Sequence, residues 1–315
     1  MKILLADSNH PVLEKTLRDA GFQCDAFWDL SAEELTRLLP QYSGLIIRSK
    51  FRVDAALLAA CPALKCIGRV GAGMENIDVA FAEARGVRCL CVPEGNRDAV
   101  GEHALGMLLM LLNHLKKADL EVRQGIWLRA ENRGTELRDK TVAIIGYGQM
   151  GSSFAKKMSG LESRVLAHDK YKNGFGSTNV LEASLEQIFE ETDILSLHLP
   201  LTAETRYYFN SEFLSRFKKP IYLINTARGK CLDTAALVDG LKSKKVLGAC
   251  LDVIEYESLS FETLDTRDFP EPMQYLLNAE NVILSPHIAG WTHESNYRMS
   301  LLIAQKMISV LAANP

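Results

Sequence analysis

The chain has 315 residues, 47% of them hydrophobic, which is enough for about two domains with a sizeable core. Its 36 basic and 39 acidic residues are well mixed and give a net charge of -3, so no surface for nucleic acid or an anionic membrane is expected. No apolar stretch approaches the ~20 residues that span a bilayer. The short apolar run after Met1 predicts a first strand rather than a signal peptide.

The seven cysteines form no C-x-x-C pair, and several stand inside apolar runs, such as Cys89 and Cys91 in VRCLCV. This usage favours small buried side chains in a reducing compartment over metal ligands. We therefore expect a cytoplasmic protein with no bound metal and no membrane partner.

Short runs of Val, Ile and Leu alternate with helical patterns along the whole chain. Their apolarity is continuous rather than alternating, which is typical of strands buried on both faces of a parallel sheet that helices cover. The expected strands are, in chain order, residues 2–6, 44–48, 64–68, 87–92, 141–146, 163–168, 193–199, 221–227, 246–253 and 281–287.

These strands form two series, separated by a long apolar helix (about 98–117) and a polar stretch, and a final helical pattern (about 292–312) follows the last strand. The pattern predicts an α/β fold of two doubly wound, Rossmann-like or flavodoxin-like parallel-sheet domains, the second inserted into the first. The first domain is predicted to comprise residues 1–97 and 287–315, and the inserted domain residues 98–286.

The stretch TVAIIGYGQMGSSFAKKM places Gly146, Gly148 and Gly151 in a G-x-G-x-x-G spacing between a strand and a helix. Such glycines permit a tight turn, the approach of a pyrophosphate, and close packing of helix on strand. The next strand ends in Asp169, whose carboxylate can accept hydrogen bonds from a ribose and would repel a 2′-phosphate, although the adjacent Lys170 weakens this discrimination. We expect NAD to bind here; a glycine-rich structural turn with a solvated Asp is the alternative.

Three later strands of the inserted domain end in unusual polar groups: Arg228 in INTARG, the acids Asp252, Glu255 and Glu257 in LDVIEYE, and His287 in SPHIAG. Ligands of open parallel sheets bind beyond the carboxyl ends of strands, so we expect these groups to converge on the nicotinamide. Taken singly, each is also explained as a surface arginine, solvated loop acids or an ordinary loop histidine.

The combination of these groups indicates a reaction. Hydride transfer between NAD and an alcohol or ketone needs a proton to move to or from the oxygen. Histidine suits this role, because its unperturbed pKa is roughly 6.5, and a carboxylate on its other ring nitrogen fixes the tautomer. An arginine offers a planar fork for a substrate carboxylate. The set therefore predicts a 2-hydroxy or 2-keto acid as the substrate.

The chain resembles the D-isomer-specific 2-hydroxyacid dehydrogenases, the family of the D-3-phosphoglycerate dehydrogenases and the glyoxylate and hydroxypyruvate reductases. The resemblance covers nearly the whole chain. Its segments are IIRSK (46–50), IGRVGAGMENID (67–78), EGNRDAVGEHALGMLL (94–109), GYGQMG (146–151), LSLHLPLTAETR (195–206), NTARG (225–229), LDVIEYE (251–257) and SPHIAG (285–290).

For catalysis, the resemblance implies that Arg228 anchors the substrate carboxylate and carbonyl, that His287 is the acid–base, and that Glu257 is its partner. Asp252 is then expected near the nicotinamide carboxamide, and Glu255 is expected to be solvated without a role. The family usually has a proline after the catalytic glutamate, whereas this chain has Ser258.

The resemblance also implies which residues contact the cofactor, at strand ends and in the phosphate turn. His198 is explained equally well as a cap of its strand. The expected contacts are Gly146, Gly148, Gln149, Met150, Gly151, Asp169, His198, Pro200, Thr226, Ala227, Asp252 and Gly290.

The first domain is expected to hold the rest of the substrate. The backbone N–H groups of Gly71, Ala72 and Gly73 can hold a carboxylate. Residues Arg48, Ser49 and Lys50 close an early strand and can hold a distal anion; Arg48 and Ser49 resemble the segment that phosphoglycerate dehydrogenases use for the substrate phosphate. Arg97 is either a third cation there or a solvated charge.

This match favours D-3-phosphoglycerate dehydrogenase activity, in serine biosynthesis, over reduction of hydroxypyruvate, glyoxylate or another small 2-keto acid. The chain ends at Pro315 without the regulatory domain that some of those enzymes carry, so feedback by serine through such a domain is not expected. The resemblance implies a homodimer that meets through the helix near 98–117. A rival of another class is an NAD-sensing corepressor-like scaffold; a formate dehydrogenase is disfavoured because it has Gln where Glu257 stands.

Overall fold

The computed structural model describes residues 1–257 and 269–313. The chain forms two compact units: unit 1 comprises Met1–Asn96 and Trp291–Pro315, and unit 2 comprises Arg97–Gly290. Unit 2 is therefore inserted into unit 1 along the chain, as the sequence predicts.

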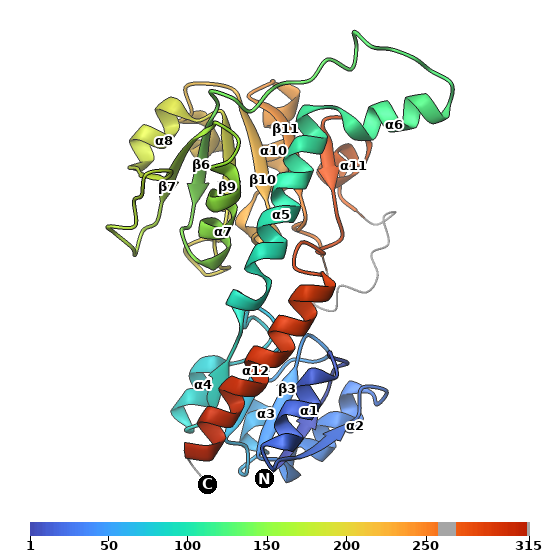
Figure 1. The fold of residues 1–315 in the computed structure, drawn as a ribbon, viewed down its shortest axis with the longest axis vertical. Coiled ribbons are helices and arrows are strands. Elements are labelled where there is room, and N and C mark those ends of the chain that lie inside the picture. The colour runs from blue at the N-terminus through green and yellow to red at the C-terminus, as the bar shows by residue number, and fades with distance from the viewer. Residues whose placement is uncertain (258–268, 314–315) are drawn as a thin grey trace. The chain divides into compact units, whose positions relative to one another are not determined.

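Unit 1 contains a five-stranded sheet with the order β2-β1-β3-β4-β5, and every strand pair is parallel. Helices α1 and α12 pack on one face and α2 to α4 on the other (Figure 1). The elements are β1 (Lys2–Leu5), α1 (Val12–Asp19), β2 (Gln23–Ala26), α2 (Ala32–Leu38), the 3-10 helix η1 (Leu39–Gln41), β3 (Gly44–Ile47), α3 (Ala55–Ala59), β4 (Cys66–Arg69), α4 (Val79–Ala84), β5 (Arg88–Leu90) and α12 (His293–Ala313).

Unit 2 contains a seven-stranded parallel sheet with the order β12-β11-β10-β9-β6-β7-β8. Its elements include most of α5 (Pro93–Leu112), then α6 (Leu115–Arg123), β6 (Thr141–Ile145), α7 (Gln149–Met158), β7 (Arg164–His168), β8 (Leu181–Glu182), α8 (Leu185–Glu191), β9 (Ile194–Leu197), α9 (Ser211–Ser215), β10 (Ile221–Asn225), the 3-10 helix η2 (Gly229–Cys231), α10 (Thr234–Lys242), β11 (Val246–Leu251), α11 (Glu271–Asn278) and β12 (Val282–Leu284).

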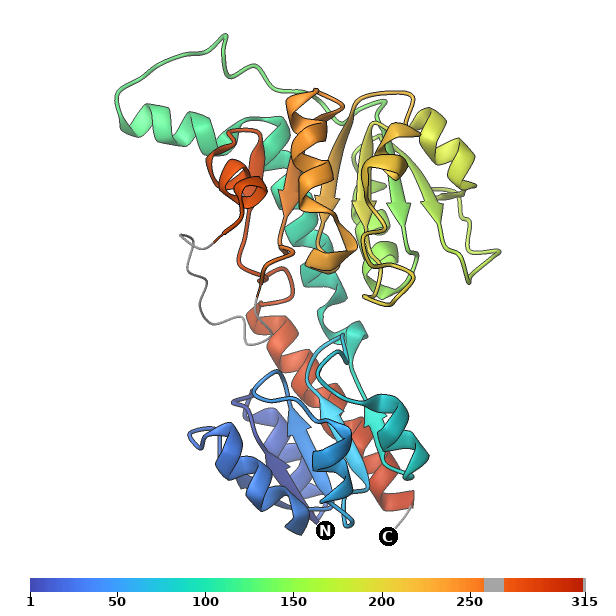
Figure 2. The same ribbon diagram turned by 180° about the vertical axis from the view of Figure 1, so that it is seen from behind.

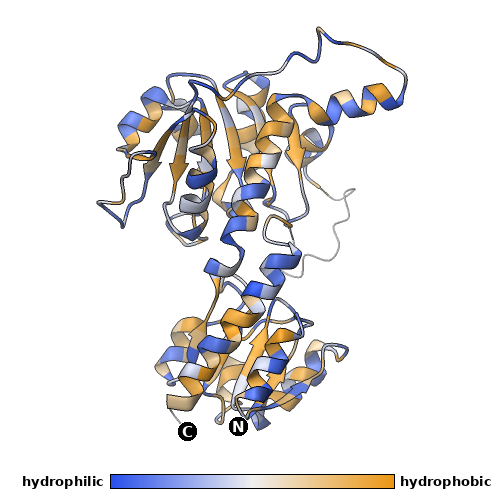
Figure 3. Ribbon diagram, in the orientation of Figure 1, coloured by the Kyte–Doolittle hydropathy of each residue, from blue (hydrophilic) through white to orange (hydrophobic). Residues whose placement is uncertain are grey.

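Both faces of the unit 2 sheet are covered, which explains why its strands are apolar throughout. Val142 and Ile144 of β6 pack with α5 and α7, whereas Ala143 and Ile145 pack with the cluster that contains α8 and α10 (Figures 1 and 2). Successive side chains of a strand point to opposite faces, so a strand between two helical layers needs apolar residues at every position. Figure 3 shows the resulting hydrophobic strands.

The structure corrects one expected helix. The helix expected over 98–117 is two helices, α5 and α6, because His114 takes a left-handed conformation (φ 52°) at which an α-helix ends. The sequence also did not predict β2 and β8. The sequence predicted domain boundaries after residues 97 and 286, and the compact units of the structure divide after residues 96 and 290. Among the described residues no helix is long and apolar enough to cross a membrane.

Candidate functional site

The predicted site residues of unit 2 all follow the carboxyl ends of its strands. The glycine turn follows β6, Asp169 follows β7, His198 follows β9, Arg228 follows β10, and the acids and His287 follow β11 and β12. Because all strands of this sheet are parallel, these ends lie along one edge. The strand order reverses between β6 and β9, and such a switch point is where ligands bind in open α/β sheets.

The turn after β6 has the backbone that a dinucleotide site requires. Gly146 has φ +94°, and a Cβ there would lie 2.5 Å from the carbonyl oxygen of His198. A Cβ on Gly151 would overlap the carbonyl of Gly146. Gly148 stands at the N-cap of α7 without a side-chain cap, and a Cβ on it would meet no atom within 4 Å. The start of α7 is therefore not covered by a capping side chain, which suits a pyrophosphate.

Asp169 is fixed by three backbone N–H groups. Its Oδ2 accepts from Tyr147 at 2.8 Å, and its Oδ1 accepts from Tyr171 at 3.0 Å and Lys172 at 3.1 Å. A carboxylate has about four acceptor positions, so roughly one is left for a ligand hydroxyl. The first of these bonds ties Asp169 to the glycine turn itself, which suits a residue that meets a ribose beside a pyrophosphate.

Two buried polar atoms at the carboxyl ends of β9 and β10 have no hydrogen-bond partner among the described residues: His198 Nδ1 and Thr226 Oγ1. The other ring nitrogen of His198 lies 2.8 Å from Ser196 Oγ, and its ring lies 5.5 Å from that of Phe154. Burial lowers the pKa of His198 to about 4, so the imidazole is neutral near pH 7. Orphaned buried polar atoms are rare in proteins, and here they fit a bound cofactor.

The turn that carries Arg228 is held by its neighbours. Asn225 is fully buried; its amide donates to the carbonyl of Arg228 at 3.1 Å and accepts from the N–H of Ala227 at the same distance. A Cβ on Gly229 would overlap the carbonyl of Ile254. The backbone after β10 therefore lies directly against the backbone after β11, and only glycine permits this approach.

The expectation that Glu255 is solvated is wrong. Its Oε1 accepts from the hydroxyl of Tyr207 at 2.7 Å, and its Oε2 accepts from the hydroxyl and N–H of Thr234 at 2.8 and 3.2 Å. Glu255 thereby joins the loop after β11 to the start of α10. A carboxylate near the N-terminus of a helix is stabilised by the free N–H groups there, so the role is structural.

Glu257 and His287 form a pair. The Nδ1 of His287 lies 3.1 Å from Oε2 of Glu257, and both side chains are part-buried. His287 has φ 55°, an unusual conformation for a residue other than glycine and one that clusters at functional sites. Ser258, where the sequence lacks the family's usual proline, lies outside the described residues.

The loop that carries His287 is fastened to Asp252, which is 1% exposed. The Oδ1 of Asp252 accepts from Ser285 Oγ at 2.6 Å and from the N–H of Ile288 at 2.9 Å, and Oδ2 accepts from the N–H of Ala289 at 2.9 Å. The N–H of His287 donates to the backbone carbonyl of Asp252 at 2.8 Å. Four hydrogen bonds that Asp252 accepts therefore hold the turn of His287.

A second histidine belongs to the same network. The Nε2 of His103, on α5, lies 2.9 Å from Ser285 Oγ and 3.5 Å from Asp252 Oδ1. His103 thus lies behind the loop of His287, to which it is linked through Ser285. The sequence analysis did not single out Ser285 or Asn225. Their position at or just after a strand end was the one feature of the sequence that could have indicated them.

In unit 1, the residues after β3 are held in place. Arg48 donates from Nε to Asn9 at 3.0 Å and from an Nη to Asn296 at 2.5 Å, and its guanidinium lies 5.7 Å from the ring centroid of Trp291. Burial lowers the pKa of Arg48, an effect that Asp7 opposes.

The other unit 1 residues are less available than the sequence suggests. The ammonium of Lys50 donates to the carbonyl of Trp28, and the N–H of Gly71 donates to the carbonyl of Arg69. Arg97, which belongs to unit 2, donates to Gln149 of the glycine turn at 2.7 Å.

A comparison with family models decides the assignment. Residues 105–289 match the model described as the D-isomer specific 2-hydroxyacid dehydrogenase, NAD binding domain. The chain belongs to this family.

Relatives within the D-2-hydroxyacid dehydrogenases cover nearly the whole chain. A D-3-phosphoglycerate dehydrogenase of Archaeoglobus fulgidus is 33% identical over 100% of this chain, which spans 58% of that protein's length. A glyoxylate reductase of Thermofilum pendens is 36% identical over 90% of this chain and 83% of its own. The solved structure of D-lactate dehydrogenase from Aquifex aeolicus, complexed with NAD and lactic acid, has a TM-score of 0.82 at 27% identity and covers 99% of this chain and 95% of its own.

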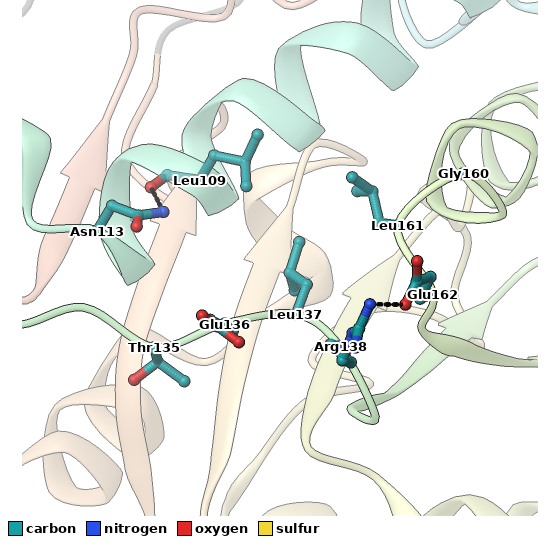
Figure 4. Close-up of a pocket in the computed structure, with 9 residues that line it drawn as sticks. All are labelled: Leu109, Asn113, Thr135, Glu136, Leu137, Arg138, Gly160, Leu161 and Glu162. Carbon is teal, nitrogen blue, oxygen red and sulfur yellow. Dashed lines mark hydrogen bonds and ion pairs between the residues drawn. The ribbon is translucent and has the colours of Figure 1, made fainter.

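A cavity of about 370 Å³ lies at the opposite end of the unit 2 sheet (Figure 4). It is lined by residues that precede β6 and β7 and by residues of α5, and Arg138 forms an ion pair with Glu162 at its wall. None of the residues predicted for catalysis or cofactor binding lines this cavity, so we do not assign it to the candidate active site. The lining residues are Leu109, Asn113, Thr135, Glu136, Leu137, Arg138, Gly160, Leu161 and Glu162.

Proposed function

We propose that the protein is an NAD-dependent D-2-hydroxyacid dehydrogenase that moves a hydride between NAD(H) and a 2-hydroxy or 2-keto acid. The observation that carries this proposal is the pair of His287 and Glu257, with 3.1 Å between Nδ1 and Oε2, on the sheet edge that also bears the glycine turn. Unit 2 is proposed to bind the cofactor and unit 1 to hold the distal part of the substrate.

The nicotinamide, when bound, would supply the hydride chemistry, its oxidised form accepting a hydride and its reduced form donating one. The chain's own residues manage the proton and the carboxylate. Glu257 holds Nδ1 of His287, which leaves Nε2 to take the hydroxyl proton during oxidation and to return it during reduction. Asp252 fixes the turn of His287, and the guanidinium of Arg228 binds the substrate carboxylate as a planar fork.

The other expected contacts toward the cofactor remain part of this proposal. Beside the glycine turn and Asp169, they are Gln149, Met150, His198, Pro200, Thr226, Ala227, Asp252 and Gly290. The uncapped start of α7 and the unpartnered atoms of His198 and Thr226 support this set.

We propose D-3-phosphoglycerate as the substrate. Arg48, oriented by Asn9 and Asn296, is proposed to meet its phosphate, with Ser49, Ala72 and Gly73 as neighbouring contacts. Full-length similarity to a D-3-phosphoglycerate dehydrogenase supports this choice. Glyoxylate or hydroxypyruvate is the alternative, which similarity to a glyoxylate reductase supports. Lys50 and Gly71 are retained as weaker contacts, since other groups engage them.

We further propose a cytoplasmic homodimer that serves serine biosynthesis. The absence of any disulfide among the seven cysteines of the described structure supports a reducing compartment. Exposed apolar side chains on α6, namely Leu115, Leu120 and Val122, support a contact with a second copy near α5 and α6.

The test is a steady-state comparison of 3-phosphoglycerate, phosphohydroxypyruvate, hydroxypyruvate and glyoxylate with NAD(H) and NADP(H). We expect the highest kcat/KM for the phosphorylated pair with NAD(H). A higher kcat/KM for glyoxylate or hydroxypyruvate would replace the substrate and leave the reaction class intact. Absence of turnover with every substrate, in a preparation that binds NADH, would favour the NAD-sensing scaffold instead.

A further inference from the structure

The three residues after Asp169 are all tied to other parts of unit 2. Lys170 forms an ion pair with Glu204, and the hydroxyl of Tyr171 donates to the same carboxylate. The ammonium of Lys172 donates to the carbonyl of Tyr147, in the glycine turn, at 3.2 Å. Both lysines that follow the proposed ribose acceptor are therefore occupied by oxygens of the protein.

Glu204 is presented by a turn that starts at the cofactor edge. The N–H of Thr202 donates to the hydroxyl of Thr205 at 2.8 Å, the N–H of Thr205 donates back to the hydroxyl of Thr202 at 3.2 Å, and Thr205 Oγ1 donates to the carbonyl of Pro200 at 2.5 Å. Thr205 is buried. The turn around Glu204 is thus fixed by side chains on either side of it, so the backbone that presents Glu204 is held in place.

The ion pair of Lys170 and Glu204 bears on whether the site can distinguish NAD from NADP. NADP differs from NAD by a 2′-phosphate on the adenosine ribose, which carries about -1.5 to -2 charges near pH 7. Binding it beside Asp169 needs a free cation. Lys170 is adjacent to Asp169 in sequence, but the bond to Glu204 raises the pKa of its ammonium and directs its charge to Glu204.

We propose that Glu204 is a specificity-determining residue that excludes NADP by holding Lys170 away from the 2′-phosphate. This inference rests on the proposed NAD-dependent function and names the residue that makes it NAD-selective. Asp169 repels the phosphate directly, whereas Glu204 acts by withholding the neighbouring cation. The sequence alone suggested the opposite for Lys170, namely that it weakens the discrimination.

The test measures binding rather than turnover. Dissociation constants of NADH and NADPH are obtained from nicotinamide fluorescence for the wild type and for Glu204→Gln. Exposed ion pairs have effects of at most about fivefold, so we expect the preference for NADH to fall by about fivefold, with the NADH constant nearly unchanged. Glu186→Gln is the matched control, because Glu186 forms a comparable exposed pair with Arg216 in the same unit.

A double variant separates the proposed route from simple loss of negative charge. If Glu204 acts through Lys170, adding Lys170→Gln to Glu204→Gln returns the NADH preference to about the wild-type value. An unchanged preference in Glu204→Gln, or a gain that persists in the double variant, would overturn the proposal. The two proposals fail separately: a wild type that binds NADH selectively but turns over no 2-hydroxy acid contradicts only the reaction. A wild type without selectivity contradicts both NAD dependence and the role of Glu204.

Discussion

Unit 1 and unit 2 are parallel sheets built by the same rule, but they differ in where they bury polar groups. In the described part of unit 1, the buried polar side chains are Ser295 and Ser300 of α12. In unit 2, Ser196, His198, Asn225, Thr226 and Asp252 are buried at or just beyond strand ends. Two of them, Asn225 and Asp252, hydrogen-bond to the loops that carry Arg228 and His287, whereas His198 and Thr226 each keep one polar atom without a partner in the described structure. In unit 2, buried polar side chains therefore hold the loops at the strand ends in place. In unit 1, the predicted ligand contacts are part-exposed side chains such as Arg48.

The largest effect that this contrast predicts is at His287. His287→Ala should lower kcat by about 10³-fold, since a positioned acid–base contributes about 10² to 10⁴. The dissociation constant of NADH should stay nearly the same. His293→Ala, at an exposed histidine in unit 1, is the control. Turnover that survives in His287→Ala would move the acid–base role to another residue.

The next effect concerns the residue beneath that histidine. Asp252→Asn keeps the shape but replaces one acceptor oxygen by a donor, so the N–H of Ile288 or Ala289 loses its partner. We expect kcat to fall by about 10²-fold and its pH profile to shift, because the turn of His287 is no longer held. Asp239→Asn, an exposed acid on α10, serves as the control. A wild-type pH profile in Asp252→Asn would contradict the positioning role.

The buried histidine of unit 2 predicts a pH dependence of stability. The pKa of His198 is about 4 in the folded chain, below its unfolded value of about 6.5. Unfolded chains therefore take up the proton first, and stability that is present above pH 6.5 is lost as the pH falls toward 4. The loss by pH 5 should be about 2 kcal/mol. Hydrogen exchange of amides in β6, β9 and β10, compared at pH 7 and pH 5, measures it.

His198→Gln removes the titrating group and keeps a polar partner for Ser196. The pH-dependent part of the exchange free energy should shrink in this variant, whereas amides of the unit 1 sheet should be unaffected. An equal loss of protection in the wild type and in His198→Gln would show that another group is responsible.

The smallest effect is predicted for unit 1. Arg48→Gln should raise KM for 3-phosphoglycerate by about tenfold, the typical weight of one charge-assisted hydrogen bond, with kcat nearly unchanged. KM for hydroxypyruvate, which lacks the phosphate, should change little. Arg52→Gln, at an exposed neighbour, is the control. An equal change of KM for both substrates would place Arg48 elsewhere than at the phosphate.

Much of the fold was predictable because buried parallel strands are continuously apolar. Ten of the strands coincide with apolar runs, and the family and the inserted arrangement are confirmed. The strands that the sequence did not predict are edge strands: β2 reads QCDA, and β8 has two exposed residues. An edge strand needs little apolar burial, so its pattern is weak. The break at His114 depends on one backbone conformation that residue type does not reveal.

The sequence predicted which residues belong to the site, but it did not predict the hydrogen bonds that hold them. Arg228, Glu257 and His287 follow strand ends that can be recognised in the sequence, and their roles stay predictions. The contacts that hold them join residues far apart in sequence, such as His103 and Ser285, which are 182 positions apart. Glu255 was expected to be solvated because its partners, Tyr207 and Thr234, are 48 and 21 positions away in the sequence, so the residues around Glu255 do not reveal them.

The close approach at Gly229 has a consequence for how such a protein changes during evolution. With no side chain between them, the backbones that bear Arg228 and Glu257 share one surface, and neither can be displaced without the other. On the proposed division of roles, the reacting end of the substrate is thereby held constant, and a new substrate is accepted by altering side chains of unit 1. Any side chain at position 229 would therefore disturb the loops of Arg228 and Glu257 together.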